Sequence, residues 1–456
     1  MSKPWYRELN QYQWFVLVVA ALGWFFDCLD QQLFNLARRP AMLELLAASP
    51  GKTPSVEDVN AYSGYATSIF LLGWATGGLA FGVLGDRIGR ATTMFWTILI
   101  YSVFTGFSAL AVGFWDFAFY RFLTGLGVGG EFAVGVALVA EVMPAASRPY
   151  ALGALQAFSA IGNLTAAAIS IILGELESRH FFESWHWNDH PISVWRLMFV
   201  VGIVPSLLAI VIRRRLHEPD AWRLNAEGEM DERKRGSYRE LFGNRRWRRN
   251  ALVGVALAFS GVVGLWAVGF FSTDLIQSVL RKRLEAQGLP ESDISGKLKI
   301  WTGIAFMAMN VGSFLGIFAF TYLTAYVGRR LAFAITFLAA MTSTAAVFLY
   351  LETYVQIFWM VPLMGFCQLA LFGGYAIYFP ELFPTHLRST GTSFCYNVGR
   401  FVAAAGPSAL GVLTSQVFAS EREPLRYAGL TLCSVFLVGL LVLPFAPETK
   451  GKPLPA

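Results

Sequence analysis

The sequence predicts an all-α membrane protein, with twelve transmembrane helices in two six-helix bundles related by an internal repeat. Composition, apolar segment length and a repeated motif offset lead to this fold class. Of the 456 residues, 55% are hydrophobic and only 14% are charged, whereas soluble domains carry about 25% charged residues. Apolar segments of about 20 residues are expected to cross the bilayer as helices, because lipid cannot satisfy free backbone groups.

Twelve segments meet this length criterion. They are residues 13–34, 62–84, 92–112, 115–140, 149–173, 194–213, 250–275, 299–323, 330–351, 354–379, 388–416 and 427–446. The first segment contains acids and no cleavage site of small residues, so it is expected to be a retained span and not a signal peptide.

A polar segment, residues 214–249, divides the chain into an N-terminal bundle (1–213) and a C-terminal bundle (250–456). This linker is rich in arginine, and basic loops stay on the cytoplasmic side of a membrane. The linker and both termini are therefore expected to be cytoplasmic, in a multi-pass protein of the cell (inner) membrane. The basic residues 281–283 conflict with this orientation. Part of 237–249 is expected to form either an amphipathic surface helix or a solvated linker.

The two halves share motifs at a nearly constant offset. EVMPAASR (141–148) follows the fourth span, and ELFPTHLR (381–388) follows the tenth, 240 residues later (381 − 141). GDRIGR (85–90) is echoed by AYVGRR (325–330) after the eighth span. This pattern indicates a parallel repeat of two bundles, a plan that alternating-access transporters use.

Several motifs also carry a family resemblance. GVLGDRIGR (82–90) and RFLTGLGVGGE (121–131) resemble the loop after span two and the fourth span of the major facilitator superfamily. PETKG (447–451) and HEPDAW (217–222) resemble sugar-porter motifs. The first-span Asp pair, the GGE of span four and YNVGR (396–400) are more similar to the aromatic acid:proton symporters and related carboxylate carriers. The resemblance covers nearly the whole chain and implies secondary active transport.

Two acids, Asp27 and Asp30, lie in the apolar first span, and Arg121 lies in the fourth. The helical rise places Asp27 and Arg121 at similar depths, roughly 20 Å from the inner face, which predicts an ion pair. The resemblance to sugar porters implies the same pairing. Asp27 is expected to carry the coupling proton, with Arg121 adjusting its proton affinity; a permanent structural ion pair is the alternative. Asp30 is expected to be a second proton site, a relay or a non-titrating cavity acid.

Arg400 lies near the middle of span eleven, and its planar guanidinium suits a carboxylate. It is expected to bind the substrate anion, and the alternative is a salt bridge to Asp27 or Asp30. Other residues expected to face the central cavity are Gln156, Asn163, Asn310, Gln368, Asn397, Tyr375 and Trp24. Weaker aromatic candidates are Phe25, Trp266, Phe372 and Tyr378.

Charged residues at the inner ends of the spans are expected to form a gate by charge pairing. They are Asp86, Arg87, Arg90, Glu141, Arg148, Glu381 and Arg388. Glu131 is expected to join this gate through Arg148 or Arg90, because it lies roughly 25 Å from the outer face. The second half has Ala325 and Tyr326 where the first has Asp86 and Arg87, so symmetric gate contacts are not expected.

No metal or cofactor is expected other than protons as the coupling ion. The loop histidines His180, His186 and His190 match no zinc spacing, and the four cysteines show neither metal nor disulfide spacing. No Walker motif is present, and LGVGG (126–130) is expected to be a close helix-packing segment and not a phosphate loop.

The sequence thus predicts a proton-coupled symporter that imports a small organic anion, such as an aromatic or sugar acid. It is expected to act as a monomer in the bilayer, and neither as an enzyme nor with nucleic acid. A sugar or polyol porter or facilitator is the alternative that PETKG suggests. A non-transporting nutrient sensor is the alternative of another class.

Overall fold

The computed structural model is almost entirely helical. It describes residues 4–47, 54–179, 181–182, 186–187, 190–191, 193–227, 234–265, 270–288, 290–403, 412–421 and 423–455. Trp266 and His180 lie outside these ranges.

The N-terminal half consists of six spans. Its helices are α1 (Gln11–Ala47), α2 (Val56–Arg87), α3 (Arg90–Ser108), α4 (Phe114–Val142), α5 (Arg148–Ser178), α6 (Val194–Val201) and α7 (Pro205–Arg215). The last two helices form one continuous span, residues 194–215. Between α5 and α6, the two-residue strands β1 (His186–Trp187) and β2 (His190–Pro191) pair antiparallel. A short 3₁₀ helix, η1 (Trp5–Arg7), precedes α1.

The linker and the C-terminal half contain the remaining elements. The α-helices are α8 (Asp220–Glu227), α9 (Tyr238–Gly243), α10 (Arg245–Val263), α11 (Phe270–Ala286), α12 (Glu291–Val327), α13 (Arg329–Tyr350), α14 (Tyr354–Tyr378), α15 (Arg388–Ala403), α17 (Pro424–Leu432) and α18 (Val435–Val442). Short elements are η4 (Phe379–Leu382), η5 (Thr385–Leu387), η6 (Leu413–Val417) and η7 (Leu443–Phe445). Residues 237–249, expected to be one amphipathic helix or a linker, are divided between α9 and the start of α10.

Ten helical stretches among the described residues are long and apolar enough to cross a bilayer. They correspond to predicted spans one to six, eight to ten, and twelve. The predicted spans 250–275 and 388–416 include residues 266–269 and 404–411, which lie outside the described ranges. The first of these spans begins within α10, and the second begins with α15.

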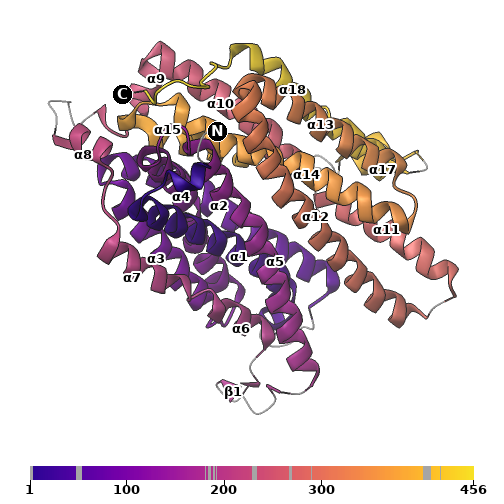
Figure 1. The fold of residues 1–456 in the computed structure, drawn as a ribbon. Coiled ribbons are helices and arrows are strands. Elements are labelled where there is room, and N and C mark those ends of the chain that lie inside the picture. Colours follow the sequence, from indigo (N-terminus) through magenta and orange to yellow (C-terminus); the bar gives the residue numbers. More distant parts are fainter. Residues whose placement is uncertain are drawn as a thin grey trace.

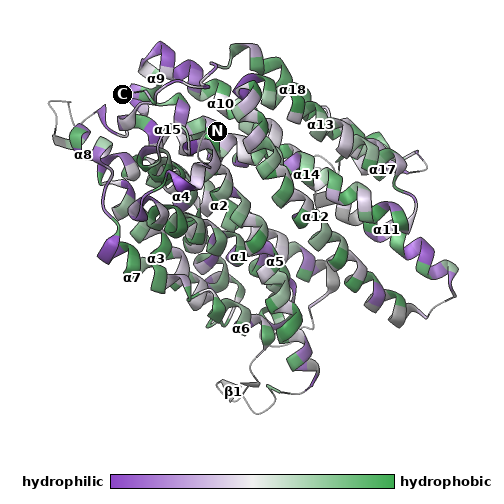
Figure 2. Ribbon diagram, viewed as in Figure 1, coloured by the Kyte–Doolittle hydropathy of each residue, from purple (hydrophilic) through white to green (hydrophobic). Residues whose placement is uncertain are grey.

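The two halves lie side by side, and both ends of the chain lie at the same end of the molecule, here called the terminus end (Figure 1). The halves approach one another at the terminus end and diverge toward the opposite end, where α11 and α12 lead away from α6. Contacts between the halves join α2 to α15, α4 to α15, and α5 to both α12 and α14. Apolar residues dominate the spans, and hydrophilic residues gather at the terminus end around α8 and α9 (Figure 2).

Glycines bring α2 and α4 into close contact. A Cβ atom on Gly129 would lie 1.9 Å from the carbonyl oxygen of Trp74, and one on Gly77 would lie 2.0 Å from that of Leu126. Gly125 stands four residues before Gly129, the spacing at which small residues let membrane helices approach closely. The LGVGG segment is therefore a helix-packing segment, as predicted, and it fixes the position of the polar residues that α4 carries.

Substituting Gly129 by alanine should lower the midpoint of thermal unfolding of the detergent-purified protein. The added methyl group overlaps the α2 backbone, and overpacking of this kind costs roughly 1–3 kcal/mol or more. Gly64→Ala in α2 is the matched control, because a Cβ there meets no atom within 4 Å. Equal unfolding midpoints for the two variants would contradict this account of the α2–α4 contact.

Candidate functional site

A buried cluster of charges joins the two halves at the terminus end. Arg90, at the start of α3, donates from Nε and Nη2 to the Glu141 carboxylate at 3.1 and 2.9 Å. Arg388, at the start of α15, donates from Nη1 to the same carboxylate at 2.7 Å. Arg90 also donates to the backbone carbonyl of Thr385, at 2.6 Å. One carboxylate of the N-terminal half is therefore shared by a guanidinium from each half.

Asp86 completes this group, which we call the gate cluster (Asp86, Arg90, Glu141 and Arg388). Its carboxylate lies 3.0 Å from Arg90 Nη2 and accepts the backbone N–H groups of Ser389 and Thr390 at 3.1 and 2.8 Å. Carboxylates stabilise helix N-termini by satisfying free N–H groups and by opposing the helix dipole. The last turn of α2 therefore caps the first turn of α15 in the other half.

The second half repeats part of this arrangement. Arg329 donates from Nε and Nη2 to Glu381 at 3.1 and 2.8 Å, as Arg90 does to Glu141. The expectation that gate contacts cannot be symmetric is wrong for this arginine–glutamate pair. The repeat preserves the pair. The halves differ where Asp86 has no acidic counterpart, and where Arg388 binds Glu141 across the junction but Arg148 binds backbone carbonyls.

Two further glutamates cap helices at the terminus end. Glu218 accepts the N–H groups of Ala91 and Thr92 at 3.1 and 3.0 Å at the start of α3. Glu448 accepts two N–H groups at 3.0 and 3.1 Å at the start of α13. Burial opposes ionisation of Glu448, but the backbone N–H groups of α13 and Lys450 outweigh it and lower the pKa of this carboxyl. Sequence reasoning did not assign these roles.

Each of the two capped helices, α3 and α13, begins directly after a glycine with positive φ, 107° for Gly89 and 92° for Gly328. A side chain is strained in this conformation, and each glycine lies directly against its capping carboxylate. The Gly–Arg pair in GDRIGR and AYVGRR is the sequence signal that could have located these caps.

Two residues predicted for the gate form no salt bridge among the described residues. Arg87 donates from Nε to the backbone carbonyl of Arg235 at 3.2 Å, which ties it to the linker. Arg148 donates to the carbonyl oxygens of Ala140 and Met143. Their expected charge pairing is wrong, because carbonyl groups of neighbouring segments satisfy both guanidinium groups.

Arg121 pairs with Asp30, and the predicted pair with Asp27 is wrong. Arg121 Nη1 lies 3.5 Å from Asp30 Oδ2, and the hydroxyl of Thr105 donates to Asp30 Oδ1 at 2.7 Å. Arg121 also donates to the hydroxyl groups of Ser108 and Thr124, both at 3.0 Å. Three residues advance a helix by only about 4.5 Å, so depth alone could not separate Asp27 from Asp30. Which of the two acids pairs with Arg121 depends on which side of α1 faces α3 and α4.

Asp27 instead faces Glu131 of α4. Both are fully buried, and their carboxyl groups lie close enough to interact, with the hydroxyl of Tyr101 beside Asp27. Neither carboxyl accepts a well-formed hydrogen bond from any other described residue. A Cβ on Gly23 would lie 2.1 Å from Glu131 Oε1, so this side chain lies against α1. The prediction that Glu131 joins the gate is therefore wrong.

Arg400 is buried at the meeting of the two halves. Its guanidinium lies over the Trp74 indole of α2, 4.3 Å from the ring centroid, and Nη1 donates to Asn397 Oδ1 at 2.9 Å. Its Nε has no partner, and no carboxylate forms a salt bridge with it in the described part of the chain. The alternative of a salt bridge to Asp27 or Asp30 is thus not realised. Arg400 does interact electrostatically with Asp27, and Trp74 is a partner that the sequence did not suggest.

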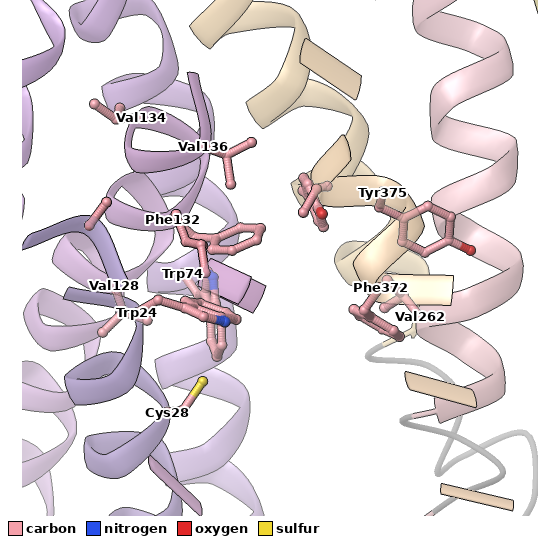
Figure 3. Packing of buried hydrophobic residues seen from close by; sticks show 14 of the residues in the cluster. Trp24, Cys28, Trp74, Val128, Phe132, Val134, Val136, Val262, Phe372 and Tyr375 are labelled. Carbon is pink, nitrogen blue, oxygen red and sulfur yellow. The ribbon is translucent and has the colours of Figure 1, made fainter. Parts of the chain in front are cut away.

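Aromatic rings surround this position. Trp24 of α1 lies 4.0 Å from the Phe132 ring of α4, and Phe132 meets Tyr396 of α15 edge to face at 5.0 Å. Figure 3 shows Trp24, Phe132 and Trp74 gathered on one side, with Phe372 and Tyr375 on the other. Trp24 therefore packs beside these rings, and its expected place at the central cavity stays a prediction.

Other predicted cavity residues divide into two groups. Asn163 of α5 donates to Asn310 of α12 at 3.0 Å, which joins the halves, and Gln156 is buried with its Oε1 unpaired. Asn397 packs against Gly78 of α2, where a Cβ would lie 2.1 Å from its amide nitrogen. Asn163, Asn310 and Asn397 thus lie at the junction of the halves. That these residues and Gln156 face a substrate cavity stays a prediction.

Gln368 and Tyr375 are engaged within the C-terminal half instead. Gln368 donates to the Thr344 hydroxyl at 2.8 Å, and the Tyr375 hydroxyl donates to the Leu257 carbonyl at 2.6 Å. Tyr375 is also stacked on neighbouring rings, so the prediction that it faces the central cavity is wrong. The described residues contain no group of three or more potential metal ligands.

Asp86→Asn should loosen the first turn of α15. Hydrogen exchange measured by mass spectrometry should show roughly 5- to 30-fold faster exchange at Ser389 and Thr390, because losing such a cap costs about 1–2 kcal/mol. Asp116→Asn is the control: Asp116 caps α4 within its own half, so exchange in α15 should not change. Unaltered protection of Ser389 and Thr390 in the first variant would refute the capping role of Asp86.

Known proteins share this chain's sequence and fold. A family model described as Major Facilitator Superfamily matches residues 20–407. A putative metabolite transport protein of Haemophilus influenzae is 28% identical over 98% of this chain and 99% of its own length. A probable 4-methylmuconolactone transporter of Cupriavidus pinatubonensis is 28% identical (98% and 93% covered), and a niacin transporter of Acinetobacter baylyi is 26% identical (98% and 96% covered).

Among solved structures, a proton:xylose symporter bound to 6-bromo-6-deoxy-D-glucose has a TM-score of 0.73 at 16% identity, with 97% of this chain and 98% of that chain covered. Its fold is the fold described above. With the family model spanning most of the residues, the chain belongs to the Major Facilitator Superfamily of membrane transporters.

Proposed function

We propose that this protein is a proton-coupled symporter that imports a small organic anion with a carboxylate group by alternating access. The observation that carries the proposal is the buried Arg400 guanidinium, which lacks a carboxylate partner among the described residues at the junction of the halves. An unpaired charge inside a membrane protein is costly and usually functional. A substrate carboxylate would supply the missing partner.

The surroundings of Arg400 favour a flat, partly apolar anion. The guanidinium is held by the Trp74 ring and by Asn397, which leaves Nε available for an acceptor. The nearby rings of Phe132 and Tyr396 offer apolar contact area. The names of two relatives refer to 4-methylmuconolactone and niacin. Each of these molecules combines a ring with a carboxylate, which supports this substrate class.

We assign the coupling proton to Asp27, which shares it with Glu131. Two carboxyls that face each other in a buried site are more stable with one proton than with two negative charges. Arg121 is already matched by Asp30 and does not need Asp27. Because Arg400 interacts with Asp27, an anion at Arg400 and a proton on the Asp27–Glu131 pair enter one shared site. Together they leave its net charge unchanged, which is a physical reason for coupled transport.

The arrangement of the halves fits an outward-facing state. The gate cluster closes the terminus end, and the halves diverge toward the other end (Figure 1). Clusters of arginine at the terminus end, residues 213–215 and 245–249, favour a cytoplasmic position for it. Release of substrate into the cytoplasm would then require separation of Arg388 from Glu141 and of Asp86 from α15.

The position of PETKG gives little support to a sugar substrate. The PETKG segment, which suggested a sugar or polyol porter, places Glu448 at the N-terminus of α13, far along the chain from the central residues and engaged in capping. This capping contact gives the segment a structural role, which supports the organic anion over the sugar or polyol alternative.

Asp27→Asn should abolish proton-driven accumulation of the substrate in proteoliposomes, with at least a tenfold lower uptake. Exchange of labelled for unlabelled substrate should persist, because exchange needs no net proton movement. Glu131→Gln should reduce the same uptake. Full accumulation by Asp27→Asn would place the proton elsewhere, and binding without any uptake by the wild type would favour a sensor.

Arg400→Lys should weaken binding of an aromatic monocarboxylate roughly 10- to 100-fold in calorimetric titrations, because the planar fork is lost. Arg196→Lys is the matched control: Arg196 also lies over a tryptophan ring, at 4.4 Å, but pairs with Glu44 at the other end of the molecule. Near-normal affinity in Arg400→Lys would rule out this substrate role.

A further inference from the structure

We propose that a groove between α10 and α18 at the terminus end binds one anionic phospholipid. The groove has a volume of about 460 Å³. Its lining residues are Arg245, Arg248, Arg249, Leu252, Val253, Ala256, Val442 and Phe445. It lies on the outer surface of the C-terminal half, separate from the gate cluster and from Arg400.

The lining of α10 changes from basic to apolar along one helical face. Arg245, Arg249, Leu252 and Ala256 follow one another at spacings of three or four residues, so they form a continuous stripe. From Arg245 to Ala256 the stripe is roughly 16 Å long. This length reaches from the headgroup region into the acyl chains of one leaflet.

The guanidinium groups at the top of the stripe are available to an anion. The side chains of Arg245 and Arg248 are exposed, and their guanidinium groups form no hydrogen bond or ion pair with the described residues. Arg249 donates only to the Phe445 carbonyl, at 3.1 Å. None of the described residues that line the groove is acidic. Guanidinium groups bind phosphate oxygens in a planar, bidentate manner, and basic clusters at this depth recognise anionic headgroups.

The apolar residues of the groove fit an acyl chain, and their side chains offer a free anion no hydrogen-bond donor. Leu252 and Phe445 are each 58% exposed, and Val253 and Val442 complete an apolar wall on α10 and α18. A ligand that satisfies both parts carries a phosphate and a hydrocarbon chain in one molecule. An anionic phospholipid of the leaflet at the terminus end is such a ligand.

The test uses the full-length protein in an uncharged detergent. Phosphatidylglycerol, phosphatidylcholine with the same acyl chains, and glycerol 3-phosphate are each titrated, and native mass spectrometry reports bound ligand. Arg245→Gln/Arg248→Gln should bind phosphatidylglycerol about tenfold or more weakly than the wild type. Leu252→Gln should also weaken it, whereas phosphatidylcholine and glycerol 3-phosphate should bind poorly to every protein.

The matched control is Arg214→Gln/Arg215→Gln, which removes two exposed arginines from the same end of the molecule, at the end of α7. This pair should leave phosphatidylglycerol binding unchanged. An equal loss in the control would mean a diffuse charge effect and overturn the site. Equal binding of the two lipids, or saturation by glycerol 3-phosphate at the same concentration, would also overturn it. The thermal unfolding midpoint of each variant shows that the comparison is between folded proteins.

Discussion

The closed arrangement of the two halves depends on one carboxylate, that of Glu141. Arg90 of its own half and Arg388 of the other half both bind it. A buried glutamate between two arginines cannot lose either partner without leaving a charge poorly compensated, and removing one partner of such a group is strongly destabilising. The Asp86 cap on α15 acts beside it. A transporter needs a contact between its halves that is strong when closed and can still open. Ion pairs at the end of a bundle meet that need, because water can solvate the same charges once the halves separate.

The interior of the N-terminal half divides its charges into a satisfied group and an unsatisfied group. Asp30 and Arg121 neutralise each other. Asp30 accepts a hydrogen bond from a hydroxyl of α3, and Arg121 donates to hydroxyls of α3 and α4, so their contribution is to hold α1 against those helices. Among the described residues, Asp27 and Glu131 face each other without a cation paired to either, and Arg400 across the junction has no paired anion. Groups that packing leaves unsatisfied are the ones that can respond to a ligand, since binding changes their energy more than that of a completed pair.

Sequence reasoning predicted the fold and the residue types of the site, but not which acid faces which base. The lengths of the apolar segments and the offset between the repeated motifs can be read from the order of the residues alone. The twelve predicted spans follow directly from them. Assigning Asp27 or Asp30 to Arg121 requires the rotation of α1 about its axis, which packing against α3 and α4 determines. Glu131 was misplaced for the same reason: its depth suggested the gate, while its direction points to Gly23. Trp74 was missed because an indole in an apolar span carries no signal until Arg400 is placed over it.

Comparing the two repeats explains why the gate cluster binds α15 in particular. Arg90–Glu141 and Arg329–Glu381 are equivalent pairs, and Glu218 and Glu448 cap α3 and α13 alike. Only the first half adds an acid, Asp86, which reaches across to α15. Arg388 and Arg400 both belong to α15, so the helix that carries the proposed substrate contact is also the helix that the gate holds at its first turn. A pull on Arg400 by a bound anion acts along a continuous helix toward Ser389 and Thr390. Occupancy of the proposed Arg400 site would therefore alter the balance at the gate through this one helix, because a ligand that binds two arrangements of α15 with different affinity shifts their populations.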